Sequence, residues 1–241
     1  GWDGTLSSEM LGYDNVNYGI WYDDAQAKKI ALQQMKVAKD LGVRRIVIGE
    51  CGHAHKASAV VADRMAYGED KVPVESCLPL LWDLVKSKAL KFDPSKNNFP
   101  VTLHDPCNVV RQMGIVQPQR RILKEICPDF REMTPHGVDN YCCGGGSGFA
   151  IMNSMNFPEF RNKISARTKF NQILGAFQDT IEEADIPKYV CAPCSNCKGT
   201  IRDILEYYQV TEKFNVHYGG LVELMVNALV SMNKPFLEFL E

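Results

Sequence analysis

The chain has 241 residues, of which 45% are hydrophobic and 23% are charged, and its formal net charge is -2. This composition predicts a folded chain with a substantial core, in one large domain or two small ones. The charge gives no general attraction to nucleic acid or anionic lipid. No apolar run reaches the roughly 18–20 residues that a membrane-spanning helix needs. We therefore expect a soluble chain with no nucleic-acid partner and no membrane span.

Helix and strand patterns alternate along the chain. Residues 23–42 have apolar side chains at helical spacing, with Asp24 placed to cap the helix start and Gly42 to end it. Further segments fit strands at residues 44–50, 71–75, 100–105, 138–143, 188–193 and 214–218, and helices at 78–86 and 201–208. The alternation predicts an α/β fold with mostly parallel sheets, in which ligands bind beyond the carboxyl ends of the strands.

The first part of the chain resembles the last part. A shift of 143 positions lays residues 47–81 on residues 190–224, with Cys51 on Cys194. We predict a duplication with two pseudo-symmetric α/β halves, residues 1–95 and residues 96–241; a chance match is the alternative. Because the chain begins at Gly1 and not at a methionine, we also expect it to be part of a longer protein.

Nine cysteines are too few for a disulfide-stapled secreted scaffold, so we expect a reducing compartment in which clustered cysteines bind metal or carry redox chemistry. Candidate thiolates come from three segments: Cys107, Cys142, Cys143, Cys191, Cys194 and Cys197. A closed zinc site uses four ligands, whereas several thiolates hold an iron-sulfur cluster. The set therefore favours an iron-sulfur cluster over zinc or buried structural cysteines.

Three glycines, Gly144, Gly145 and Gly146, directly follow the adjacent pair of cysteines. Because they lack Cβ atoms, they allow the backbone to approach a bulky cluster and to point N–H groups at its sulfurs. We therefore expect this segment to line the cofactor.

Three motifs together resemble the cysteine-rich CCG family: HDPCNVVRQMG from His104, YCCGGGSG from Tyr141 and CAPCSNCKGTI from Cys191. The resemblance covers roughly residues 100–229. The family includes a cysteine-rich component of heterodisulfide reductase and components of glycolate and lactate oxidation systems. It also includes the catalytic iron-sulfur component of the membrane complex associated with dissimilatory sulfite reduction. The GECGHA and CAPCSNCKG stretches are most similar to this last protein.

The resemblance implies that five motif cysteines hold a non-cubane [4Fe-4S] cluster at which a disulfide or trisulfide-type substrate is reduced. Carried over, the ligands are Cys107, Cys142, Cys143, Cys194 and Cys197, and Cys191 is the alternative to one of the last two. Ala54 stands where the repeat would place the final cysteine of the first half. We therefore expect that half to have lost its cluster.

Other residues are candidates for binding or catalysis. His104 and Arg111 flank Cys107, and we expect them to contact the cofactor or an anionic substrate group; a structural turn and a surface salt bridge are the alternatives. In the first half, Cys51 is a candidate reactive thiol, and His53 and His55 are candidate proton donors. The alternative is that this loop only stabilises the fold.

These observations predict a heterodisulfide reductase-like oxidoreductase. Its expected partners are a sulfur substrate, either a small disulfide or a cysteine-bearing protein tail, a ferredoxin-like electron donor, and the subunits of a membrane complex. We expect a cytoplasmic location, with attachment to the inner face of the membrane through those subunits. An electron relay in hydroxy-acid oxidation and a zinc-stabilised interaction domain are the alternatives.

Overall fold

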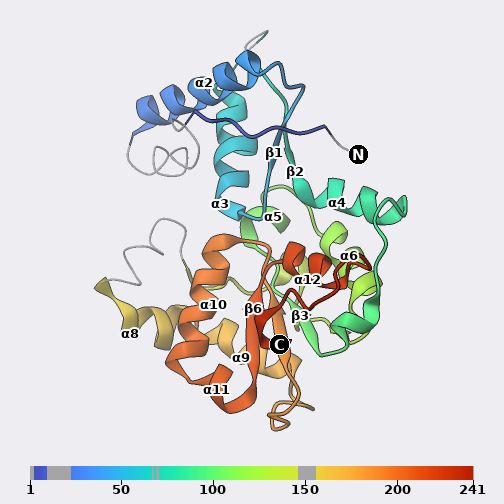
Figure 1. Cartoon of the computed structure of the whole chain (residues 1–241). Helices are drawn as coiled ribbons and strands as arrows, with labels where there is room; N and C mark the ends of the chain where they lie inside the picture. Colours follow the sequence, from blue (N-terminus) through green and yellow to red (C-terminus); the bar gives the residue numbers. More distant parts are fainter. Residues whose placement is uncertain (1–2, 10–22, 67, 69–70, 146–155, 241) are drawn as a thin grey trace. The chain divides into compact units, whose positions relative to one another are not determined.

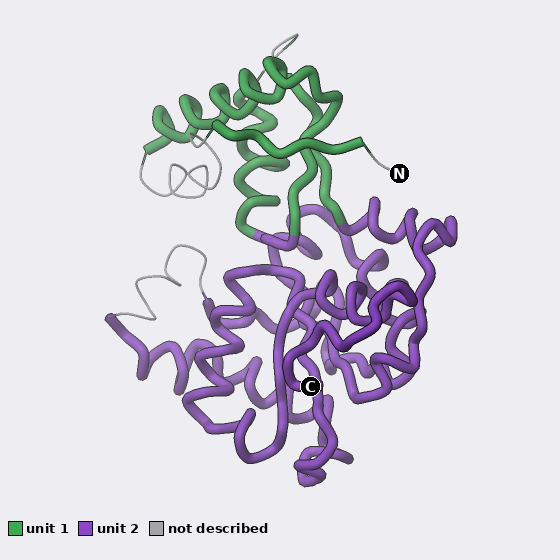
Figure 2. The backbone as a smooth tube through the Cα atoms, viewed as in Figure 1, with its two compact units in different colours: residues 1–49, 53–77 green, residues 50–52, 78–241 purple. Residues whose placement is uncertain are grey.

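The computed structural model describes residues 3–9, 23–66, 68, 71–145 and 156–240 (Figure 1). The chain divides into two compact units (Figure 2). The first comprises Gly1–Gly49 and His53–Cys77, and the second comprises Glu50–Gly52 and Leu78–Glu241. Among the described helices, none combines the length and apolar character that crossing a membrane requires.

The first unit contains a two-stranded parallel sheet and a long helix. Strand β1 (Ile46–Ile48) pairs with β2 (Val74–Ser76). The helical elements are α2 (Asp24–Asp40), η1 (His55–Val61) and η2 (Ala62–Arg64), and α3 (Gly52–Ala54) begins at the junction of the units.

The start of α2 corrects one prediction. Asp23, not Asp24, caps the helix, because Asp23 has an extended backbone and its Oδ1 accepts hydrogen bonds from the N–H groups of Ala25 at 2.7 Å and Gln26 at 3.3 Å. Asp24 is already helical. Gly42 ends the helix as predicted, with a φ of +65° that favours glycine.

The second unit is built on a four-stranded parallel sheet. The strand order is β4 (Phe130–Arg131), β3 (Val101–Leu103), β5 (Lys188–Cys191), β6 (Val216–Gly219). Its helical elements are α4 (Cys77–Lys86), η4 (Pro94–Asn97), α5 (Cys107–Val110), α6 (Gln117–Ile126), η5 (Gly137–Asp139), α8 (Pro158–Phe160), η6 (Arg161–Ser165), α9 (Arg167–Ala176), α10 (Ser195–Tyr207), α11 (Val210–Phe214), α12 (Leu221–Ala228) and η7 (Glu238–Leu240). The predicted α/β class with parallel sheets is confirmed.

Alternate residues of β5 face opposite sides of this sheet. Val190 belongs to a buried cluster with Ile173 of α9 and Ile204 of α10. The hydroxyl of Tyr189 instead donates to Glu223 Oε2 of α12 at 3.2 Å. Because strand side chains alternate, Cys191 shares the Tyr189 side and not the Val190 side.

A strand predicted at residues 138–143 is wrong. Residues Gly137–Asp139 form a 3-10 turn, and the two cysteines that follow lie in an irregular segment. The carbonyls of Val138 and Asn140 accept hydrogen bonds from the guanidinium of Arg111, at 2.7 and 2.6 Å. The edge position beside β3 belongs to β4.

The two sheets have matching registers. In the first sheet, Ile46 pairs with Val74 and Ile48 with Ser76. Adding 143 to these four residue numbers gives Tyr189 with His217 and Cys191 with Gly219, and both are observed pairs of the second sheet. The division into halves at residue 95 stays a prediction; in the structure, residues 78–95 group with the second unit.

Candidate metal centre

Two of the three cysteine motifs follow neighbouring strands of the second sheet. The backbone N–H of His104, just after β3, donates to the carbonyl of Cys191 at the end of β5, at 2.8 Å. Cys107 is the first residue of α5, and Cys194 is the N-cap of α10, which carries Cys197 in its first turn. The carboxyl ends of parallel strands meet at one edge, so both motifs reach the same place.

Five thiols form a continuous chain of contacts at this edge. Hydrogen-bonding contacts link them in the order Cys107, Cys142, Cys143, Cys197, Cys194. Cys142 is exposed and Cys107 half-buried, whereas the other three are buried. Solvent therefore reaches the thiols at Cys142 and, in part, at Cys107.

Backbone amides point at three of these sulfurs. The N–H of Gly144 donates to Cys142 Sγ and that of Gly145 to Cys143 Sγ, both at 3.4 Å. The N–H of Gly52, in the short segment that belongs to the second unit, donates to Cys194 Sγ at 3.3 Å. Such donors stabilise negative charge on sulfur. Gly146, the third predicted cofactor glycine, lies outside the described residues.

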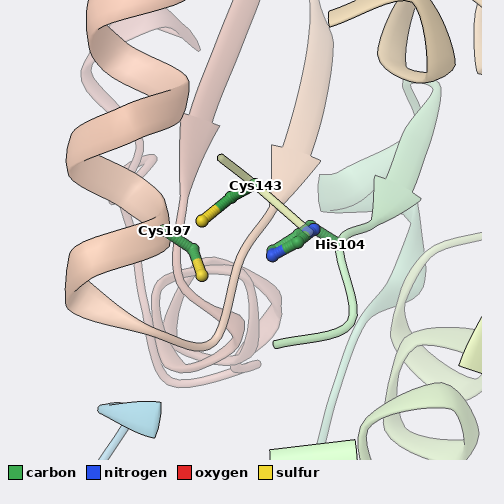
Figure 3. Close-up of side chains that lie close together, drawn as sticks. All are labelled: His104, Cys143 and Cys197. Carbon is green, nitrogen blue, oxygen red and sulfur yellow. The ribbon is translucent and has the colours of Figure 1, made fainter. Parts of the chain in front are cut away.

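His104 contributes a buried imidazole to the same place. Its accessible surface is 0%, and neither ring nitrogen has a hydrogen-bond partner among the described residues. One of its nitrogens and the sulfurs of Cys143 and Cys197 all lie within 4.8 Å of one another, and Figure 3 shows the three side chains converging. Burial and the charge of Lys169 hold the pKa of His104 well below its ordinary value, so the ring is neutral.

The thiols cannot all ionise without a compensating cation. Hydrogen bonds from Cys107 and Cys143 lower the pKa of Cys142, so its thiolate forms first. The contact with Cys142, followed by burial, raises the pKa of Cys107. Contacts with Cys143 and Cys194 raise that of Cys197. A group that carries several positive charges removes this conflict, which fits the donor set of an iron-sulfur cluster.

Cys191 does not take part in this chain. Its thiol is fully buried on the Tyr189 side of β5, and burial, followed by the charges of Glu50, Cys127 and Glu223, raises its pKa. Cys143, Cys194 and Cys197 share the cluster of Val190 on the other side.

Gly144 needs to be a glycine for two reasons. Its φ is +82°, a conformation that L side chains rarely adopt, and a Cβ there would overlap the backbone carbonyl of Ser165. The hydroxyl of Ser165 donates to the carbonyl of Gly144 at 3.0 Å. Gly144 is therefore packed against the end of η6.

A buried ion pair supports the loop between His104 and Cys107. Both oxygens of Asp105 accept hydrogen bonds from Arg120 of α6, and Oδ2 also accepts from the N–H of Gly137 at 2.7 Å. Arg111, predicted to bind cofactor or substrate, donates to the carbonyls of Val138 and Asn140. It thereby holds the segment before Cys142.

The predicted catalytic residues are divided between the units. Cys51 is half-buried in the Glu50–Gly52 segment of the second unit. His53 and His55 belong to the first unit and are buried, and His55 Nε2 forms a hydrogen bond of 2.7 Å with Ser76 Oγ. Their catalytic roles stay predictions.

Sequence reasoning missed one charged residue near the thiols. Lys169 of α9 is fully buried, and the charges that act on its ammonium include those of Cys143, Cys197 and Cys142. It lies in no recognisable motif, and its helical spacing resembles that of an ordinary surface lysine.

Comparison with known proteins agrees with this site. Residues 101–202 match the model of the cysteine-rich domain family called CCG. The Hdr-like menaquinol oxidoreductase iron-sulfur subunit of Archaeoglobus profundus is 24% identical over 94% of this chain and 44% of its own length. Its counterpart, numbered 2, from Archaeoglobus fulgidus is 25% identical over the same shares.

A third relative is a component of the dihydromethanophenazine:CoB–CoM heterodisulfide reductase of Methanosarcina acetivorans, which is 30% identical over 58% of this chain and 36% of its own length. No solved structure matches the chain. The chain spans about 44% of the length of the two Archaeoglobus relatives. Residues 101–202 are thus similar to the cysteine-rich CCG family, and most of the chain is similar to Hdr-like iron-sulfur subunits.

Proposed function

We propose that this chain is an iron-sulfur oxidoreductase module that reduces a disulfide or trisulfide-type sulfur substrate at a non-cubane [4Fe-4S] cluster. The contact chain of five thiols, solvent-exposed at Cys142, carries the proposal. The Methanosarcina relative belongs to a heterodisulfide reductase, which supports the proposal that the substrate is a sulfur compound.

The residues of this chain bind the cofactor, tune its charge and limit its contact with water. Cys107, Cys142, Cys143, Cys194 and Cys197 would hold the cluster. When bound, such a cluster supplies one-electron redox chemistry. The N–H groups of Gly52, Gly144 and Gly145 stabilise thiolate charge, and the burial of Cys143, Cys194 and Cys197 excludes water from one side. Neutral His104 offers a further donor atom there.

The partners in this proposal follow from the reaction. Reducing a disulfide consumes two electrons and two protons and yields two thiols, so an electron donor is required. We propose a ferredoxin-like domain or subunit for this role, within a membrane complex of sulfur or sulfite metabolism on its cytoplasmic side. The names of the relatives, which include a menaquinol oxidoreductase and a probable membrane-anchored ferredoxin, support a quinol-linked, membrane-attached assembly.

The first test is the metal content of protein purified without oxygen. We expect about four irons per chain, with matching sulfide, and a broad visible absorbance that bleaches on reduction. Elemental analysis and absorption spectra measure both. Stoichiometric zinc with negligible iron would contradict the proposal and favour a zinc-stabilised interaction domain.

A second test concerns the residues that we propose for catalysis, Cys51 and His53. A departing thiolate needs a proton, and histidine can supply one near neutral pH. We expect Cys51→Ala and His53→Ala to keep their iron but to slow disulfide or trisulfide reduction by roughly tenfold or more.

The matched control for these variants is His217→Ala. His217 lies on β6, stacked on Phe239 with the ring centroids 4.1 Å apart, and its Nε2 contacts Asn215. Iron content and turnover should both stay at wild-type levels in this variant. Unchanged turnover in Cys51→Ala and His53→Ala would show that their loop is structural.

A further inference from the structure

Lys169 is a buried lysine whose hydrogen-bond partners are all neutral. Lys169 has 0% exposed surface, and its Nζ donates to Asn140 Oδ1 at 2.9 Å, to Gln172 Oε1, and to Met133 Sδ at 3.6 Å. The ion pairs found among the described residues do not include Lys169. A buried ammonium without a counter-ion is costly, so some other negative charge is expected close by.

The negative groups that act on Lys169 point to the thiol site. Burial lowers the pKa of Lys169 to about 8, and Cys143, Cys197, Asp105 and Cys142 oppose this effect in that order. The carboxylate of Asp105 is already paired with Arg120. The cysteines of the thiol site, which would carry negative charge when they hold a cluster, are therefore the remaining source of negative charge around the ammonium.

The hydrogen bonds of Lys169 also fix its place relative to the thiols. Asn140, which accepts from Nζ, lies two residues before Cys142, and its side-chain amide donates to the carbonyl of Asp105 at 3.2 Å. Gln172 holds Nζ from the next turn of α9 and donates to the carbonyl of Pro135 at 2.5 Å. Neutral partners orient the ammonium without neutralising it.

We propose that Lys169 is the built-in counter-charge of the cluster site and sets its reduction potential and its retention. This inference rests on the proposed function, because it requires a cluster held by these thiolates. Adding an electron to such a cluster adds negative charge, which a fixed buried cation nearby stabilises. Lys169 is thus a positioning and tuning residue: its charge favours the reduced form.

The chain offers a matched control in Lys188. This lysine also has 0% exposed surface, but its Nζ donates to the carbonyls of Glu183, Ile186 and Phe214, at 2.7, 2.8 and 3.1 Å. Lys188 is the first residue of β5, whereas Cys191 is the last. Replacing Lys188 therefore removes a buried lysine from the same unit but leaves the charge near the thiols unchanged.

The test compares Lys169→Met, Lys169→Arg and Lys188→Met in the full chain, purified anaerobically, by iron content and redox titration of the visible spectrum. In Lys169→Met we expect the ratio of reduced to oxidised cluster at a fixed potential to fall at least tenfold, a shift of about 59 mV for one electron. Lys169→Arg keeps the positive charge and should have a reduction potential close to that of the wild type. Lys188→Met should titrate like the wild type.

Each other outcome is also decisive. Loss of iron in Lys169→Met alone would support the counter-charge as a requirement for retention. An unshifted potential in Lys169→Met, or equal effects in Lys169→Met and Lys188→Met, would overturn the inference and leave the proposed function standing. Wild-type protein without iron would overturn both.

Discussion

Cys194→Ser and Cys197→Ser are each expected to lose most of the bound iron, whereas Cys191→Ser keeps it. Cys197 is in contact with both Cys143 and Cys194 in the thiol chain, and all three are buried. Removing a buried thiolate leaves an iron without its ligand, and because metal binding and local folding are coupled, we expect a roughly tenfold or larger drop in retained iron.

Cys191→Ser is the matched control, because it makes the same chemical change three residues before Cys194 and on the other side of β5. Iron and sulfide assays with the visible spectrum of each variant give the answer. Retention of iron in Cys197→Ser together with its loss in Cys191→Ser would reverse the ligand assignment.

Gly144→Ala is expected to destabilise the second unit strongly. The new side chain would have to adopt a φ of +82° and would overlap the backbone carbonyl of Ser165. The left-handed conformation alone costs an alanine about 1–2 kcal/mol. Because the overlapping atoms of Ser165 are backbone and cannot simply rotate away, we expect a total loss in the free energy of unfolding of at least about 3 kcal/mol.

Gly114→Ala separates these two contributions. Gly114 has a φ of +68° in the same unit, but a Cβ there would meet nothing within 4 Å. Denaturant unfolding of both apo-proteins should show only the conformational cost for Gly114→Ala. Equal losses in the two variants would mean that the contact with Ser165 has no energetic weight.

The strands and the edge that carries the site were predictable from the sequence. The runs that became β1, β3, β5 and β6 are short and apolar, with a buried-strand pattern, and motif cysteines follow β3 and β5 directly. Local pattern is sufficient for β3 and β5 because every residue of these two strands is buried, and burial on both faces favours continuous apolar side chains.

The spacing of the cysteines alone did not show whether Cys191 or its neighbours Cys194 and Cys197 are the cluster ligands. All three cysteines of CAPCSNC are close in sequence, and only the alternation of β5, followed by the turn into α10, sends Cys191 to one side and the later pair to the other. Lys169 was beyond prediction for a different reason. Its place near the thiols depends on contacts between segments distant in sequence.

The segment Glu50–Gly52 has a consequence for dividing the molecule into fragments. Glu50 Oε1 accepts from the N–H of Leu221 at the start of α12 at 2.6 Å, and the carbonyl of Glu50 accepts from the N–H of Ser195 at 3.0 Å. The N–H of Gly52 donates to Cys194 Sγ, so Glu50 and Gly52 together contact the first turns of two helices and one thiol of a unit that otherwise begins at Leu78. Proteolysis or gene truncation that removes the chain before residue 78 would therefore also remove part of the candidate metal centre, so a single cut cannot release the second unit intact.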